Sequence, residues 1–184
     1  MPDEELEPRA KRIEAEFPPG ATMPEELRRL CDYLDATGYP ISGYMRLRPE
    51  GSTLQDYFGE GSDAWKDLAG FGAGPDGSIL ALWLNDSTRD TRVAPVVHLG
   101  SEGDALKVLA KDFRSFLELF AIGYNEIGFD DLAEPPKEPE SAGALRIWLE
   151  QEFGIIPPTV GAGIVEAANQ VHPGFASWVD QMSR

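Results

Sequence analysis

The segment from residue 74 to residue 124 constrains the fold of this chain more than any other part. A glycine-rich turn leads into a short apolar run (79–84), and a polar connection separates this run from a second (93–99) and a third (106–110). Short apolar runs bounded by turn residues are typical of buried strands. An amphipathic helix follows, with its apolar residues on one face: Phe113, Phe116, Leu117 and Phe120. This order predicts a meandering sheet closed by a helix.

A second amphipathic helix is expected nearer the N-terminus. Its apolar residues recur at helical spacing: Leu27, Leu30, Cys31 and Leu34. Gly38 stands where the C-cap of this helix belongs. Residues 3–16 contain few large apolar side chains and predict a frayed or surface helix. Residues 39–47 alternate loosely between apolar and polar side chains and predict a strand or an extended segment.

The pattern is weaker between residues 49 and 73. Residues 54–58 (LQDYF) suggest one helical turn, and residues 64–71 (AWKDLAGF) suggest another. Near the C-terminus the pattern is again helical. Helices are expected over three ranges: 142–153, 163–170 and 173–182.

These patterns predict an α+β fold with a mostly antiparallel sheet of four to six strands, flanked by helices. We divide the chain into a charged N-terminal helical segment (1–21), an α+β domain (22–133), a Pro/Glu-rich linker (134–141) and a helical C-terminal extension (142–184). The expected core is apolar: Leu27, Leu30, Leu34, Leu80, Leu82, Val96, Leu99, Phe113, Phe116, Leu117 and Phe120. The sequence leaves open the oligomeric state. It also leaves open whether residues 140–184 pack on the domain or on another chain.

The charge of the chain limits its partners. There are 32 acidic residues against 16 Lys and Arg, a formal net charge of -16. Such a surface repels phosphate backbones, so binding to nucleic acid is not expected. It would steer a basic protein inward and raise its association rate. Solubility alone is the alternative explanation of the charge.

Cysteine usage and hydropathy indicate a cytoplasmic protein. Cys31 is the single cysteine, which excludes an intramolecular disulfide and any multi-cysteine metal site. The first residues are charged and contain no apolar region of the kind found in secretory signals. No window approaches the roughly 18 consecutive apolar residues of a membrane helix, so no membrane partner is expected.

A search for catalytic motifs finds none that is convincing. Gly72, Gly74 and Gly77 match the spacing of a dinucleotide fingerprint, but they open a strand instead of a helix. His98 and His172 lack metal-ligand spacing and are interpreted as structural, as is Cys31 on its apolar stripe. With 32 acids, close carboxylate pairs arise by chance. We therefore expect no enzyme activity, no cofactor and no metal.

The second half of the domain resembles the SUKH superfamily, which includes bacterial polymorphic-toxin immunity proteins and a fungal cell-wall-synthesis regulator. Similar domains show a glycine turn before a strand, a Pro-Val strand, an acidic turn and a closing F-x-x-F-L helix. The matching residues here are Gly74 to Gly77 with the strand from Ile79, Pro95-Val96-Val97, Gly100 to Gly103, and Phe113, Phe116 and Leu117. A looser match is the helix opening at Pro24 to Leu27 and the following Gly38. The resemblance covers residues 24 to about 124.

This resemblance implies a protein-binding function without catalytic residues. With the excess of acid, it suggests a bacterial immunity protein that neutralises a basic toxin, such as a nuclease, by occlusion. The expected contact residues come from polar turns and the weakly patterned central region: Asp56, Tyr57, Glu60, Asp63, Trp65, Asp86, Asp90, Glu102 and Asp104. The alternative is a regulatory or scaffold domain that binds a cellular protein. An enzyme that uses scattered carboxylates is a third possibility.

Overall fold

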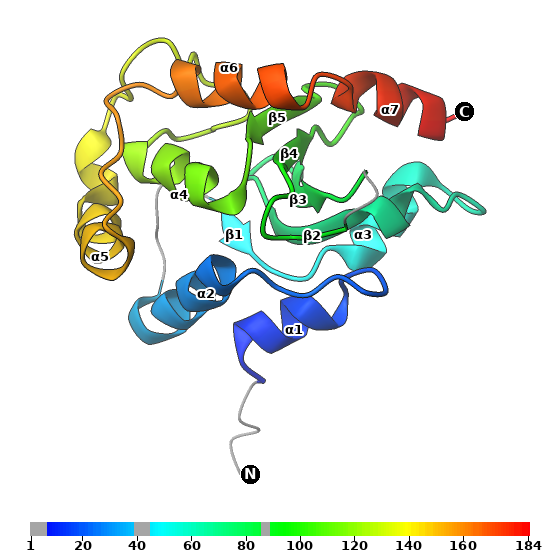
Figure 1. The fold of residues 1–184 in the computed structure, drawn as a ribbon, viewed down its shortest axis with the longest axis horizontal. Helices are drawn as coiled ribbons and strands as arrows, with labels where there is room; N and C mark the ends of the chain where they lie inside the picture. The colour runs from blue at the N-terminus through cyan, green and yellow to red at the C-terminus, as the bar shows by residue number, and fades with distance from the viewer. Residues whose placement is uncertain (1–6, 39–44, 86–88) are drawn as a thin grey trace.

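The computed structural model describes residues 7–38, 45–85 and 89–184. The helices within these ranges are α1 (Arg9–Ala15), α2 (Glu25–Thr37), α3 (Gly51–Phe58), α4 (Phe113–Ile122), α5 (Gly143–Phe153), α6 (Ala162–Val171) and α7 (Phe175–Met182), with 3-10 turns η2 (Ala64–Asp67) and η3 (Pro139–Ala142). The strands are β1 (Arg46–Leu47), β2 (Leu68–Ala73), β3 (Ile79–Trp83), β4 (Val96–Leu99) and β5 (Lys107–Ala110) (Figure 1). The predicted α+β class is confirmed.

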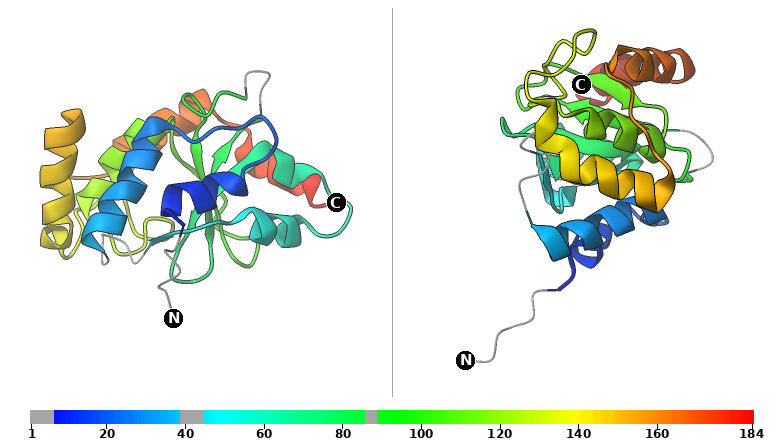
Figure 2. Two further views of the ribbon diagram at one scale, coloured as in Figure 1. Left: turned by 90° about the horizontal axis from the view of Figure 1, so that it is seen from below. Right: turned by 90° about the vertical axis from the view of Figure 1, so that its left-hand side faces the viewer.

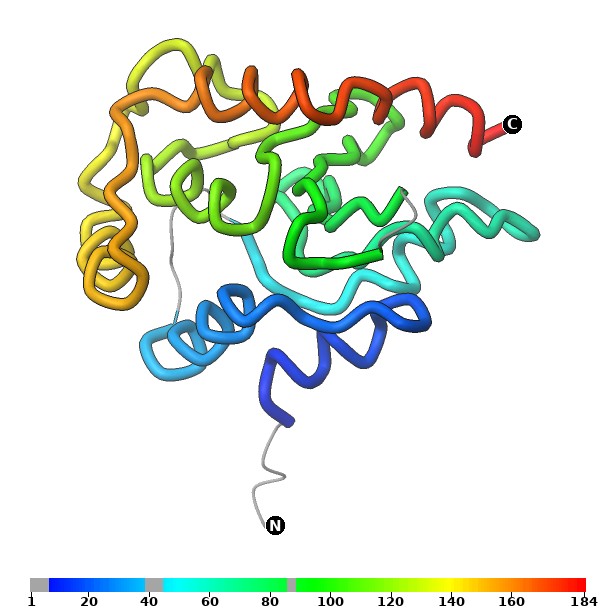
Figure 3. The backbone as a smooth tube through the Cα atoms, in the orientation of Figure 1, coloured from blue at the N-terminus to red at the C-terminus, as the bar shows by residue number. Residues whose placement is uncertain are grey.

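All five strands belong to one antiparallel sheet in the order β1-β2-β3-β4-β5. Each strand therefore pairs with its neighbour along the chain, and the backbone path in Figure 3 follows this meander. At the centre of the sheet, Ile79 pairs with Leu99 and Leu82 pairs with Val96. The register shifts in β2 between Gly70 and Gly72, which is an irregularity of the kind that bends a strand.

The strands are buried on both faces of the sheet. Successive side chains of a strand point to opposite faces. In β3, Leu80 and Leu82 accordingly belong to one buried cluster, whereas Ile79, Ala81 and Trp83 belong to the other. This explains why residues 79–84 are apolar without alternation. The result is a three-layer arrangement with helices on both sides of the sheet.

The first face, which contains Leu80 and Leu82, packs against α1, α2, α4 and α5. Helix α4 begins at the N-cap Asp112, whose carboxylate accepts a hydrogen bond from the Ser115 N–H at 2.7 Å. It ends at Gly123, which adopts a left-handed conformation (φ 104°) that glycine tolerates best. Figure 2 shows α4 and α5 side by side, with α1 and α2 next to them.

The second face packs against α3, α6 and α7 through Leu54, Phe58, Ala168, Phe175 and Val179. Helix α6 lies along the edge strand β5 (Figure 1). The Asn169 side-chain amide donates a hydrogen bond to the Val108 carbonyl at 3.0 Å. A helix that covers an edge strand hinders edge-to-edge pairing with other chains. The C-terminal helices thus pack on the same sheet as the rest of the chain.

All eleven predicted core residues are buried, so this prediction is confirmed. The three C-terminal helices agree with their predicted ranges to within a few residues. The N-terminal helix is more tightly packed than a surface helix, because Ile13 is fully buried and α1 packs against α2. Of the extended segment expected over 39–47, only Arg46–Leu47 forms a strand, and residues 39–44 lie outside the described ranges.

The helical turn expected over residues 64–71 is confirmed for residues 64–67 and wrong for residues 68–71. A 3-10 turn occupies 64–67, and the chain then enters strand β2, so the glycine-rich turn joins two strands. Glycine and alanine have low strand propensity, so the sequence pattern did not predict this strand. Packing explains the glycine at position 70: a Cβ there would lie 2.8 Å from atoms of Glu50 and Leu54. Helix α3 can approach β2 closely only because this side chain is missing.

Candidate functional site

An open groove of about 600 Å³ lies between α3, the turn that joins β4 to β5, and α7. In Figure 1 these segments lie on the same side of the sheet, with α7 leading to the C-terminus. The groove is lined by residues from all three segments: Asp56, Tyr57, Ser101, Glu102, Gly103, Leu106, Val179, Asp180 and Ser183. We call this site the acidic groove, because three of its residues are carboxylates and none is basic.

Helix α3 supplies Asp56 and Tyr57. Leu54 and Phe58 lie four residues apart, so they share one face of the helix and are both buried against the sheet. This orientation leaves Asp56 exposed and Tyr57 half-buried. The packing of the apolar stripe therefore decides which side chains of α3 face the groove.

A tight turn supplies the second wall. The Gly100 N–H donates to the Asp104 carbonyl at 3.0 Å, and the Gly103 N–H donates to the Gly100 carbonyl at 3.1 Å. Gly103 has a positive φ of 78°, which glycine adopts without strain. Two backbone hydrogen bonds close the turn, and its residues Glu102 and Asp104 are exposed to solvent.

The floor of the groove is apolar and includes Leu106 and Val179. The hydroxyl oxygen of Tyr57 is buried and has no hydrogen-bond partner among the described residues. Burial raises the pKa of Tyr57, and the negative charge of Asp104 raises it further. The phenol is therefore neutral at pH 7 and keeps a hydrogen-bond donor. A buried polar group without a partner carries a desolvation cost.

Helix α7 forms the third wall, which the sequence prediction did not include. Its apolar side pairs Phe175 and Trp178 with Trp83 of β3, at ring-centroid distances of 5.0 and 5.5 Å. Asp180 lines the groove and forms an exposed ion pair with Arg184 at 2.7 Å. The amphipathic pattern of residues 175–182 predicted a packed helix, but it contained no signal for which segments the helix would meet.

A second, shallower hollow of about 320 Å³ adjoins α3. Gln55, Asp56, Gly59, Glu60, Gly61, Ser62 and Trp65 line it. Asp56 belongs to both hollows, so the two are neighbours along α3. Five of the residues predicted to contact a partner thus line this region, namely Asp56, Tyr57, Glu60, Trp65 and Glu102, and a sixth, Asp104, acts on Tyr57 through its charge.

The other predicted contact residues lie elsewhere or are neutralised locally. Asp63 pairs with Lys66 at 2.7 Å. Asp90 belongs to the connection between β3 and β4, at the opposite end of the antiparallel sheet from Glu102. Hydrogen bonds from Arg92 lower the pKa of Asp90 to about 2. Asp86 lies outside the described residues.

The side chains with the most reactive chemistry lie inside the fold. Cys31 is fully buried, and burial raises the pKa of its thiol to about 12, so no thiolate forms at neutral pH. Sequence reasoning missed Glu50, a fully buried carboxylate that forms an ion pair with Arg48. No group of three or more His, Cys, Asp or Glu side chains within the described ranges is arranged to hold a metal ion.

Comparisons with known proteins find no relative. No protein-family model matches the chain, and neither the curated proteins nor the solved structures contain a significant match. In the part of the chain that the structure describes, no helix combines the length and the apolar character needed to cross a membrane.

Proposed function

We propose that this protein is a non-enzymatic protein-binding domain, and specifically a bacterial, cytoplasmic immunity protein that neutralises a basic toxin by occlusion. The acidic groove is the observation that carries the proposal. It combines an apolar floor with exposed carboxylates from α3 and the β4–β5 turn, and with Asp180 of α7, which pairs with Arg184. The net charge of -16 and the resemblance of residues 24–124 to the SUKH superfamily support the same function.

The proposed mechanism assigns separate tasks to charge and to apolar surface. Asp56, Glu60, Glu102 and Asp104 attract a basic partner and speed its association. The floor around Tyr57 and Leu106 supplies most of the affinity, because half-buried aromatic anchors at the centre of an interface contribute more than charges at its rim. A toxin such as a nuclease uses its basic groove for substrate, so covering that groove blocks its activity.

The first test is a pull-down from the native lysate with tagged protein at low salt, followed by elution with rising salt. We expect a basic protein that elutes at moderate salt and whose toxic activity is absent while it is bound. Recovery of a stable complex with a housekeeping protein would instead favour the regulatory or scaffold function. Recovery of neither would remove the support for a basic partner.

Charge variants then test the groove directly. We expect Asp56→Asn, Glu60→Gln, Glu102→Gln and Asp104→Asn together to slow association with the captured partner at least tenfold at low salt. The matched control neutralises four exposed carboxylates elsewhere: Asp32→Asn, Glu138→Gln, Glu140→Gln and Glu150→Gln. Both variants change the net charge equally. Equal rates for the two variants, measured by stopped flow, would locate the binding surface outside the groove.

A further inference from the structure

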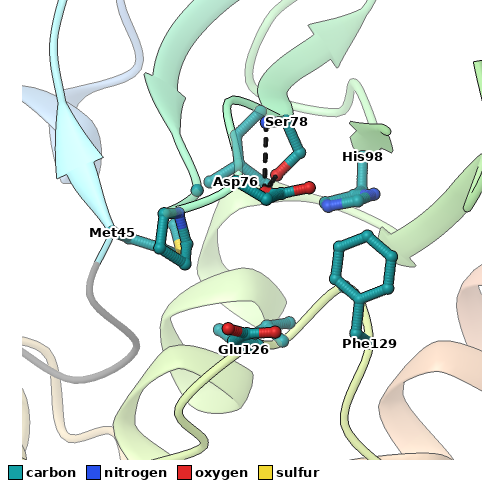
Figure 4. A pocket seen from close by; sticks show the side chains of 11 residues that line it. Met45, Asp76, Ser78, His98, Glu126 and Phe129 are labelled. Carbon is teal, nitrogen blue, oxygen red and sulfur yellow. Dashed lines mark hydrogen bonds between the residues drawn. The ribbon is translucent and has the colours of Figure 1, made fainter. Parts of the chain in front are cut away.

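A small cavity lies between the β2–β3 turn, strand β4 and the loop at residues 126–129 (Figure 4). Its volume is about 20 Å³, and its polar lining comes from Asp76, Ser78, His98 and Glu126. A space of this size holds roughly one water-sized group. Met45, Leu80, Ile127 and Phe129 form apolar walls around the polar groups.

His98 presents an unused hydrogen-bond acceptor to this cavity. The side chain is 3% exposed, and its Nδ1 lies 2.7 Å from the Ala105 carbonyl. A carbonyl can only accept, so Nδ1 carries the proton and Nε2 carries a lone pair. No described residue is a hydrogen-bond partner of Nε2, and Figure 4 shows the imidazole turned toward Asp76. Burial lowers the pKa of His98, which favours this neutral form.

Gly128 allows the loop to close over the ring. A Cβ at this position would lie 2.2 Å from Nε2, which no side chain tolerates. The next residue, Phe129, is 45% exposed. Its ring packs edge-to-face against the His98 imidazole, with the ring centroids 5.5 Å apart. The loop thus places an exposed aromatic ring at the mouth of the cavity, above the buried acceptor.

The charges around the cavity are mainly negative. Burial acts to raise the pKa of Asp76, but hydrogen bonds from the Ser78 hydroxyl (2.6 Å) and N–H (3.2 Å) outweigh it and lower the pKa. Asp76 is therefore ionised at neutral pH. Glu126 lies on the other side of the cavity (Figure 4). The Lys107 ammonium donates to the Gly128 carbonyl, and its positive charge contributes to the lowered pKa of His98.

The lining decides the class of ligand. Two carboxylates and a neutral imidazole nitrogen accept hydrogen bonds and repel anions. An ammonium group is about the size of water and donates three hydrogen bonds, whereas a guanidinium is planar and larger. The apolar walls and the ring of Phe129 suit an aliphatic stem and a nearby positive charge.

We propose that this cavity binds a primary ammonium group on an aliphatic chain, as presented by a lysine side chain of the basic protein partner. The assignment of this ammonium group to a lysine of a protein partner rests on the proposed function. The cavity and the acidic groove share one end of the sheet: a Cβ on Gly77, next to Asp76, would lie 3.8 Å from the Cβ of Ser101, which lines the groove. His98 pairs with Leu80 and so lies on the first face of the sheet, whereas Tyr57, Leu106 and Val179 of the groove belong to the second. A partner in the groove would therefore reach His98 with a lysine that extends around this end of the sheet.

The test uses n-butylammonium as the probe, because it requires no partner. Imidazole nitrogen NMR shifts of the full chain are followed during titration, with n-butanol and n-butylguanidinium as matched neutral and bulky probes. We expect n-butylammonium to shift the His98 signals saturably and to leave those of His172 unchanged. The other two probes should shift neither histidine. A His98 that responds equally to all three probes, or to none, would overturn the proposal and leave a cavity for water only.

Two variants sharpen this result. Asp76→Asn keeps the acceptor that bonds Ser78 but removes the charge, and we expect it to weaken n-butylammonium binding roughly tenfold. Glu138→Gln removes an exposed charge outside the cavity lining and should leave binding unchanged. Equal weakening by both variants would mean that general attraction accounts for the binding. The titration is independent of the pull-down, so the cavity and the immunity function can fail separately.

Discussion

The two faces of the sheet share five strands but bury different kinds of side chain. On the first face, Phe71, Phe113, Phe116 and Phe120 form a chain of ring contacts, and each is fully buried. On the second face, Tyr57, Trp65 and Trp178 stay partly exposed. The Tyr57 hydroxyl and Trp83 Nε1 are buried there without a hydrogen-bond partner among the described residues. Partly buried rings also pack at the margin of the first face, namely Tyr33, Trp148 and Phe153. The difference between the faces therefore lies in the buried polar atoms of the second face, which lower its contribution to stability.

The largest expected effect comes from removing one aromatic ring from each face. Phe116→Ala should cost about 3–5 kcal/mol, because it empties a fully buried site on the first face. Trp178→Ala should cost roughly half as much, since part of that side chain already contacts water. Urea unfolding of both variants measures the difference. Equal losses would mean that the second face is as important for stability as the first.

Two tyrosines test whether polar groups on the two faces differ. The Tyr124 hydroxyl lies 2.8 Å from the Glu134 carbonyl and accepts a hydrogen bond from the Gly161 N–H at 3.0 Å. Tyr124→Phe should cost about 1–3 kcal/mol, because buried backbone groups lose their partner. Tyr57→Phe should leave stability nearly unchanged or raise it slightly, because the buried Tyr57 hydroxyl has no partner to lose. A large loss of stability in Tyr57→Phe, measured by thermal unfolding, would contradict the comparison.

Removing the N-cap of α4 tests how much this cap contributes to the stability of the first face. Asp112→Ala removes the hydrogen bond to the Ser115 N–H and should cost about 1 kcal/mol. Lys111→Ala, one residue earlier and exposed, is the control and should change stability by less than about 0.5 kcal/mol. Chemical denaturation distinguishes the two. If the two variants were equally stable, the cap would not contribute to the packing of α4.

The smallest expected effect is a pH dependence from His98. Burial lowers its pKa in the folded state, and its charged neighbours are Asp76, Asp104, Lys107 and Glu126. The unfolded chain therefore takes up a proton first as the pH falls below about 6.5, and folding stability declines from there. Unfolding free energies between pH 7.5 and 5.5 should fall for the wild type and change less for His98→Gln. His172→Gln should retain the wild-type slope.

Local patterns in the sequence were sufficient for several elements. The helical spacing of Phe113, Phe116 and Phe120 predicted α4. The apolar run of β3 likewise predicted a buried strand, whereas its burial on both faces is a finding of the structure. These predictions succeeded because the spacing of apolar side chains and the residue types at helix ends are local properties of the chain.

The prediction failed where the role of a residue depends on a neighbour that is distant in the sequence. Gly70 lay within an expected helical turn, yet it belongs to β2 and is required there because Glu50 and Leu54 lie against the strand. Asp180 gave no signal as a groove residue, because its place depends on where α7 docks. Asp90 and Glu102 both looked like acidic turn residues, and only the antiparallel register separates them to opposite ends of the sheet.

The sequence by itself determined the class of fold, the buried stripes and the acidic character of this protein, because charge and hydrophobic periodicity are properties of the chain. Only the tertiary structure decided which carboxylates gather around Tyr57 and which nitrogen of His98 faces a cavity. Both depend on contacts between segments far apart in the chain. Such contacts follow from packing the whole apolar surface at once, and no local pattern encodes them.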